Sequence, residues 1–148
     1  MYPQLKLENQ LCFRFYAASR LITQAYHPLL KSLGLTYPQY LVMMVLWEKD
    51  HQPVNDIAKR LMLNTNTITP LLKRMENDGL VKRDKDSDDA RKVIVSLCPK
   101  GKNLEKKAAN IPIQLANAFS CNEITPESTK ALAESIDVWI RNLNNNTL

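Results

Sequence analysis

The sequence predicts a mainly helical chain with a small β-hairpin, arranged as a winged helix-turn-helix flanked by N- and C-terminal helices. Three observations lead to this fold class. Residues 54–77 hold two consecutive segments with the apolar spacing of buried helix faces. Residues 80–97 hold two short strand patterns around a charged loop. Longer amphipathic segments lie on both sides of this central part.

The N-terminal part of the chain is expected to form two helices. The first should run from about Leu7 to Lys31, because apolar residues recur along it every three or four positions. The second should begin after Thr36 and extend to about Trp47. Thr36 and Gln39 have the spacing of a capping box, in which each side chain bonds to the backbone of the other residue.

Residues 54–77 are expected to form two short helices joined by a tight turn. The first carries apolar residues at Val54, Ile57 and Leu61, the spacing of one buried face. Asn64 should cap the second helix, because its side-chain oxygen can accept hydrogen bonds from free backbone N–H groups. Pro70 removes one N–H inside this helix, so a bend is expected near its start. Candidates for contact with DNA bases and phosphates lie along this second helix: Thr65, Asn66, Thr67, Thr69, Pro70, Lys73 and Arg74.

The predicted hairpin consists of strands Leu80–Arg83 and Val93–Leu97, with residues Asp84–Lys92 as the loop. Four aspartates outweigh three cations in this loop, so a general attraction to DNA is not its purpose. Asp89 is instead expected to orient the Arg91 guanidinium toward a minor groove, where negative potential attracts it. The alternative is a solvated charged hairpin without a partner.

Two further helices are expected after the hairpin, over Lys100–Ser120 and Pro126–Leu143. Their apolar residues exceed what one central winged unit can cover: Leu115, Ala118, Phe119, Leu132, Ile136, Trp139 and Ile140. Packing against a second copy of the chain would cover them. A homodimer also suits DNA recognition, because two recognition helices one helical turn apart match a pseudo-palindromic site.

A single domain is expected, because 148 residues suffice for one hydrophobic core. Its expected parts are dimerisation helices at about 1–35 and 100–148 and a winged helix-turn-helix at about 36–99.

The net charge of +5 favours a polyanionic partner, here double-stranded DNA. The three cysteines, at positions 12, 98 and 121, are odd in number and form no CxxC pair. This argues against a disulfide framework and a structural zinc site, and no metal or cofactor is expected. The longest apolar run, Tyr40–Trp47, is too short to cross a bilayer, and no signal peptide opens the chain. A cytoplasmic protein without a membrane partner is therefore expected.

The order of these elements resembles the MarR family of dimeric regulators over essentially the whole chain. Three segments resemble more narrowly the organic-hydroperoxide-sensing, OhrR-type repressors: LENQLCFRFYAASR at 7–20, AYHPLLKSLGLTYPQYLVMMVLWE at 25–48 and TITPLLKRMENDGLVKR at 67–83. The resemblance implies that Cys12 is the peroxide-reactive thiol. It also implies that Tyr26 and Tyr37 hydrogen-bond to the thiolate across the dimer, with Tyr16 nearby on the same helix as Cys12.

Helix geometry limits how Cys12 and Tyr26 can meet. They lie about 21 Å apart along a straight helix, at roughly 1.5 Å per residue. They can meet if a second copy runs antiparallel or if the helix breaks before Pro28, and the dimer is the simpler solution. A lone cysteine on an apolar helix is ordinarily a small buried hydrophobe. It is the resemblance that favours a redox role here.

The other two cysteines receive separate interpretations. Some OhrR-type proteins form a disulfide between subunits through a cysteine near the last helix, and Cys121 matches that region. An incidental surface cysteine is an equal alternative. Without Cys121, the sulfenic acid of Cys12 would be capped by a small thiol or oxidised further. Cys98 precedes a helix where the family more often carries threonine, and it is interpreted as structural.

The resemblance implies a repressor that leaves a pseudo-palindromic operator when an organic hydroperoxide oxidises Cys12. One alternative is a MarR-type regulator released by a non-covalent phenolic or lipid effector. A second alternative is an enzyme such as a thiol peroxidase. It is disfavoured because neither His27 nor His51 lies near a cysteine in a hydrolase or protease pattern. No enzymatic activity is expected.

Overall fold

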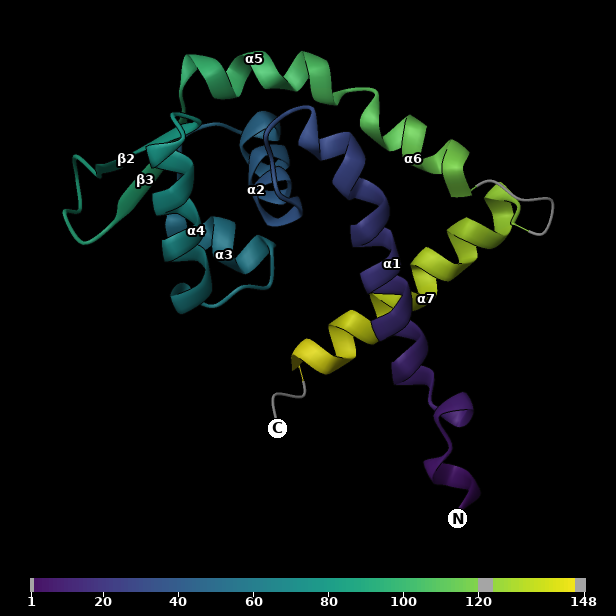
Figure 1. Ribbon diagram of the computed structural model, residues 1–148. Coiled ribbons are helices and arrows are strands. Elements are labelled where there is room, and N and C mark those ends of the chain that lie inside the picture. The colour runs from purple at the N-terminus through teal and green to yellow at the C-terminus, as the bar shows by residue number, and fades with distance from the viewer. Residues whose placement is uncertain (1, 120–123, 146–148) are drawn as a thin grey trace. The chain divides into compact units, whose positions relative to one another are not determined.

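The structure is a computed structural model that describes residues 2–119 and 124–145 (Figure 1). The helices are α1 (Leu11–Lys31), α2 (Tyr37–Glu48), α3 (Val54–Arg60), α4 (Thr65–Asn77), α5 (Pro99–Ala108), α6 (Ile111–Phe119) and α7 (Pro126–Asn145). The strands are β1 (Gln52–Pro53), β2 (Val81–Lys85) and β3 (Val93–Leu97). The mainly helical fold class with a small wing is thus confirmed. No helix in the described part is long and apolar enough to cross a membrane. The chain divides into two compact units, residues 1–111 and 112–148.

Helix α1 begins at Leu11, so the predicted start at Leu7 was wrong. Residues 3–5 and 7–9 form 3₁₀ turns instead, and Gln10 is extended. Polar side chains hold this segment outside the helix: Asn9 donates to the carbonyl of Pro3 at 2.8 Å, and Arg14 to that of Glu8 at 2.6 Å. Cys12 therefore lies in the first turn of α1 rather than inside a longer helix.

Helix α2 is the central helix of unit 1. The predicted capping box is present, with Gln39 N–H donating to the Thr36 hydroxyl and Thr36 N–H donating to the Gln39 side chain. The helix contacts α1, α3, α4 and α5 (Figure 1). Because it is surrounded, α2 is apolar on nearly every side. Fully buried side chains from α2, α3, α4, the strands and the turn before β2 form most of the core: Val42, Met43, Leu46, Ile57, Ile68, Leu72, Met75, Leu80, Val81 and Val95.

The sheet has three antiparallel strands in the order β1-β3-β2. Val95 on the central strand pairs with Gln52 on one side and Arg83 on the other. The sequence pattern missed β1, because two residues are too few to show an alternation. Strand β2 also extends to Lys85, which pairs with Val93, so the loop is shorter than predicted. Gly79 has a φ of +70° and follows the C-cap of α4, where glycine adopts the left-handed conformation that ends a helix.

The helix expected over Lys100–Ser120 is two helices, α5 and α6, separated at residues 109–110. Pro112 explains the break, because its ring has no N–H and would clash with the carbonyl four residues earlier in a continuous helix. At the start of a new helix the same proline is tolerated. In unit 2, α7 leaves Leu132, Trp139 and Leu143 exposed.

Candidate DNA interface and redox site

Helix α4 presents the residues predicted to contact DNA. Asn64 caps the helix as expected, since its side-chain oxygen accepts from the N–H and the hydroxyl of Thr67, both at 3.0 Å. Burial of Ile68 and Leu72 turns the opposite face outward. All seven candidates are exposed: Thr65, Asn66, Thr67, Thr69, Pro70, Lys73 and Arg74. The helix is unbroken through Pro70.

The wing forms the predicted pair between Asp89 and Arg91. Arg91 Nε donates to Asp89 Oδ1 at 3.0 Å, and Nη2 donates to Oδ2 at 3.3 Å. These hydrogen bonds lower the pKa of Asp89. The Arg91 side chain is 91% exposed, so the pair holds a guanidinium in solvent at the tip of the sheet. Its contact with a minor groove stays a prediction.

A hollow of about 200 Å³ lies between α4 and the wing. Its lining combines hydroxyls of α4 with cations of the hairpin: Thr65, Thr69, Arg83, Arg91 and Lys92. Hydroxyls and cations together suit the DNA backbone, whose phosphates and sugars take up about half to two-thirds of protein–DNA hydrogen bonds. Sequence analysis did not single out Arg83 or Lys92, because their place beside α4 depends on how the hairpin packs.

Glu76 fastens β2 to α4, a contact that sequence analysis also missed. Its carboxylate accepts from Arg83 Nε at 2.9 Å, Nη2 at 2.7 Å and the backbone N–H at 2.9 Å. These bonds fix the start of the hairpin relative to the exposed face of α4. The signal in the sequence was weak, namely two opposite charges on either side of the Gly79 turn.

Hydrogen bonds from Arg83 lower the pKa of Glu76 below its ordinary value. A carboxyl whose pKa is lower in the folded state contributes stability above its unfolded pKa and loses that contribution as the pH falls through the folded pKa. Wild-type protein should therefore lose stability from about pH 4.5 downward, and Glu76→Gln should show a smaller loss. Urea denaturation across this range measures the difference. An exposed control, Glu105→Gln, should follow wild type, and a Glu76→Gln profile equal to wild type would refute the effect.

The predicted redox residues fall into two groups. Cys12 is exposed in the first turn of α1. Tyr16 follows one turn later, exposed and close to Arg20, whose guanidinium carbon lies 5.6 Å from the ring centre. Tyr26 lies in the C-terminal part of α1 and Tyr37 is the first residue of α2. Their ring centres are 4.8 Å apart.

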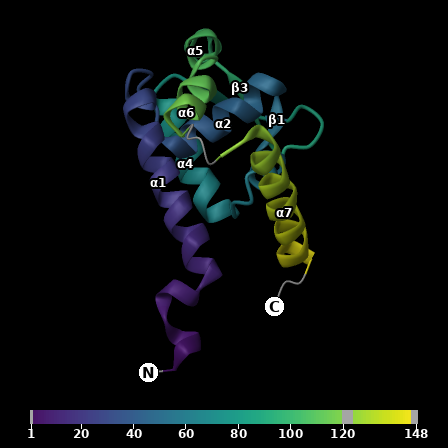
Figure 2. The same ribbon diagram turned by 90° about the vertical axis from the view of Figure 1, so that its right-hand side faces the viewer.

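Cys12 and Tyr26 do not meet within one chain. Helix α1 is continuous from Leu11 to Lys31 and contains Pro28 without a break (Figure 2). The alternative of a break before Pro28 is therefore wrong, and contact between Tyr26 and Cys12 through a second copy stays a prediction. Burial, and then the neighbouring Tyr37, raise the pKa of Tyr26. Its phenol thus keeps its proton and can act as a hydrogen-bond donor.

Comparison with known proteins places these features in a family. A family model described as transcriptional regulator SarA/Rot matches residues 24–108. The organic hydroperoxide resistance transcriptional regulator of Bacillus subtilis (strain 168) is 47% identical over 111 residues, which cover 75% of this chain and 76% of that protein. The chain belongs to the MarR family of winged-helix regulators. AbsC, a MarR family transcriptional regulator from Streptomyces coelicolor, shares the fold at 22% identity, with a TM-score of 0.81 and coverage of 96% of this chain and 98% of AbsC.

Among solved structures, this MarR-family chain is similar to AbfR of Staphylococcus epidermidis. Reduced AbfR bound to DNA is 38% identical, with 95% of this chain and 96% of AbfR covered and a TM-score of 0.78. Overoxidized AbfR bound to DNA matches at 37% identity, 95% and 96% coverage and a TM-score of 0.76. Disulfide-formed AbfR matches at 36% identity, 97% and 95% coverage and a TM-score of 0.65.

The remaining cysteines of this MarR-family chain differ in what the structure describes. Cys121 lies outside the described residues, so its resolving role stays a prediction. Cys98 is partly buried and occupies the N-cap position of α5 without a side-chain hydrogen bond to the helix. The side chain of Cys98 thus does not cap α5, and its structural role stays a prediction.

Cys98→Thr should stabilise the protein by about 1 kcal/mol, because a threonine hydroxyl can accept from a free N–H in the first turn of α5. Urea denaturation of reduced protein measures the change. Cys98→Ala is the matched control and should bring no gain. Equal stability of the threonine and alanine variants would show that the N-cap of α5 cannot use a hydroxyl.

Proposed function

We propose that this chain is a redox-sensing transcriptional regulator, acting as a cytoplasmic homodimer rather than as an enzyme. Reduced protein binds a pseudo-palindromic operator in double-stranded DNA, and an organic hydroperoxide releases it by oxidising Cys12. The observation that carries the proposal is an exposed cysteine in the first turn of α1, in a chain 47% identical to an organic hydroperoxide resistance regulator.

The DNA-binding step uses α4 and the wing. Helix α4 enters the major groove with its exposed hydroxyl, amide and cationic side chains, as recognition helices do. Arg91, held by Asp89, reaches the adjacent minor groove. Lys92 adds positive charge in the hollow between α4 and the wing, whereas the Arg83 guanidinium there is paired with Glu76. Because phosphate contacts release counterions, the affinity should fall steeply as salt is raised.

The redox step takes place across the dimer, where Tyr26 and Tyr37 of one copy donate hydrogen bonds to the Cys12 thiolate of the other. The thiolate attacks the distal oxygen of the hydroperoxide. An S–O bond forms as the O–O bond breaks, and the alkoxide takes up a proton and leaves as an alcohol. Sulfur is thereby oxidised to sulfenic acid and the peroxide is reduced. The first turn of a helix favours the negative charge that the sulfur carries during this reaction.

Release follows when the sulfenic acid condenses with a second thiol. This step forms an S–S bond and expels water. The second thiol is Cys121 of the other copy or a small-molecule thiol. AbfR has been solved bound to DNA in reduced and overoxidized forms and also with a disulfide formed, which supports a disulfide as one oxidised state of this chain.

A non-covalent effector is the second candidate, and one observation favours it. A cavity of about 500 Å³ lies between α1 and the start of α2. Its lining includes apolar and polar residues: Thr23, Gln24, His27, Leu30, Lys31, Leu35 and Tyr37. A phenolic or lipid molecule of that size could occupy the cavity and shift α2. In that case Cys12 would take no part in the release of DNA.

Fluorescence anisotropy tests the proposed function. Reduced protein is titrated onto labelled DNA from upstream of its own gene at two salt concentrations, and cumene hydroperoxide is then added. Binding that weakens with salt and is lost on oxidation supports a redox-sensing regulator. Binding that persists under hydroperoxide but is lost with a phenolic acid favours the second candidate. Repeated consumption of hydroperoxide with a thiol reductant would instead indicate an enzyme.

A further inference from the structure

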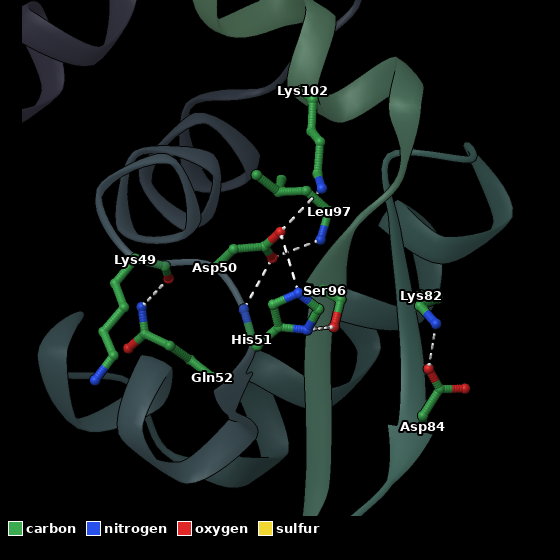
Figure 3. A network of polar contacts seen from close by, with 9 residues as sticks. All are labelled: Lys49, Asp50, His51, Gln52, Lys82, Asp84, Ser96, Leu97 and Lys102. Carbon is green, nitrogen blue, oxygen red and sulfur yellow. Dashed lines mark hydrogen bonds and ion pairs between the residues drawn. The ribbon is translucent and has the colours of Figure 1, made fainter.

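Asp50 joins the end of α2 to two consecutive elements far along the chain, the end of β3 and the start of α5 (Figure 3). It follows the end of α2, and its Oδ1 accepts from the N–H of His51 and from the N–H of Leu97 at the end of β3, both at 2.8 Å. Its Oδ2 lies 3.4 Å from Nζ of Lys102 in α5. Burial opposes ionisation, but the bonds from Leu97 and His51 outweigh it and lower the pKa of Asp50. The carboxylate is thus charged at neutral pH and bound on both oxygens.

The two residues after Asp50 also connect β3 and α2. His51 has a φ of +58°, the left-handed region that non-glycine residues rarely adopt. Its Nδ1 lies 2.8 Å from the hydroxyl of buried Ser96 on β3 (Figure 3). Gln52 then donates to the carbonyl of Val45 in α2 at 3.1 Å. The strained turn is therefore held from β3 on one side and from α2 on the other.

Strand β3 needs such an anchor. It is the central strand, but one neighbour, β1, has only two residues, and the other, β2, forms a hairpin with it. A two-stranded hairpin is marginally stable by itself in water. Glu76 connects α4 to β2, and Asp50, after the end of α2, connects to β3 through the N–H of Leu97. Arg91 lies in the loop between these two strands, so its position depends on both anchors.

We propose that Asp50 is a positioning residue for the wing, fixing β3 to α2 and α5 so that Arg91 is held beside α4. This role rests on the proposed function in one respect, namely that the wing contacts DNA. Asp50 itself lies away from the wing loop, at the opposite end of β3. Its effect on DNA binding must therefore pass through the position of β3.

Hydrogen–deuterium exchange tests the anchoring without DNA. In Asp50→Ala, amides of residues 92–98 should exchange at least about tenfold faster, because the Leu97 N–H loses its acceptor. Residues 65–77 of α4 should keep wild-type exchange. Asp50→Asn retains an acceptor oxygen and should give an exchange rate between those of wild type and Asp50→Ala. If Asp50→Ala is broadly unfolded, the rate in Asp50→Asn tests the anchoring instead. Glu48→Gln removes a charge that pairs with Arg60 near the same helix end and should match wild type. Exchange in the Asp50 variants equal to that of Glu48→Gln would overturn the proposal.

A double-mutant cycle tests whether the anchor acts through the wing. Asp50→Ala and Arg91→Ala should each weaken binding to operator DNA by about tenfold, and the double variant should also be about tenfold weaker. A double variant weakened about a hundredfold would mean independent effects and would overturn the positioning role. If wild-type protein binds no DNA, the proposed function fails, whereas the exchange of residues 92–98 still decides whether Asp50 anchors β3.

Discussion

Cys12→Ser should bind operator DNA as tightly as reduced wild type and stay bound when organic hydroperoxide is added. Serine keeps the size and hydrogen-bonding capacity of the side chain but cannot form a sulfenic acid or a disulfide. Wild-type protein should lose at least about a hundredfold in affinity on oxidation, which corresponds to a coupling free energy of about 3 kcal/mol. Anisotropy titrations of both proteins, reduced and oxidised, measure this difference.

Two other cysteine variants make the Cys12 result specific. Cys98→Ser should respond to hydroperoxide as wild type does, because Cys98 is partly buried at the start of α5. Cys121→Ser separates the two routes after oxidation. It should abolish release in buffer without thiols if Cys121 is the second thiol, and added small thiol should restore release. Release of Cys12→Ser by hydroperoxide at wild-type concentrations would refute the role of Cys12.

Gly101→Ala should destabilise the protein by about 2 kcal/mol, although alanine normally favours a helix by up to about 1 kcal/mol over glycine. Gly101 lies in α5, and a Cβ there would stand 2.3 Å from the carbonyl oxygen of Leu80. That oxygen also accepts from the N–H of Cys98 at 3.0 Å, and the Gly101 carbonyl accepts from Trp47 Nε1 at 3.0 Å. Neither the Leu80 backbone nor the Gly101 backbone can move away without breaking these hydrogen bonds.

Urea denaturation compares Gly101→Ala with Asn103→Ala, an exposed position in the same helix. The control should gain a few tenths of a kcal/mol from helix propensity. A Gly101→Ala protein as stable as the control would mean that α5 does not pack closely on the turn at Leu80.

Local signals were sufficient for much of the DNA-binding unit. Thr36 and Gln39 form their capping box, Asn64 caps α4, and Gly79 ends it with a positive φ. Each of these features depends on residues within a few positions of one another, so the chain itself specifies them. The pair between Asp89 and Arg91 was predictable for the same reason.

Contacts between distant segments could not be predicted in this way. The bonds from Asp50 to Leu97 and Lys102 span about half of unit 1 in sequence, and no periodicity marks them. Strand β1 exists because Gln52 reaches β3, not because of its own pattern. The later start of α1 likewise depends on side chains bonding to the backbone of the preceding turns. The break between α5 and α6 was also missed, although a local signal for it, Pro112, was present in the sequence.

The most direct test of the redox mechanism follows Cys12 and DNA in the same sample. Protein bound to labelled operator is titrated with cumene hydroperoxide, while anisotropy reports bound DNA and peptide mass spectrometry reports the state of Cys12. We expect the released fraction to follow the fraction of Cys12 converted to a disulfide. DNA that is released while Cys12 remains a free thiol, or that stays bound when Cys12 is fully in the disulfide form, would contradict the account.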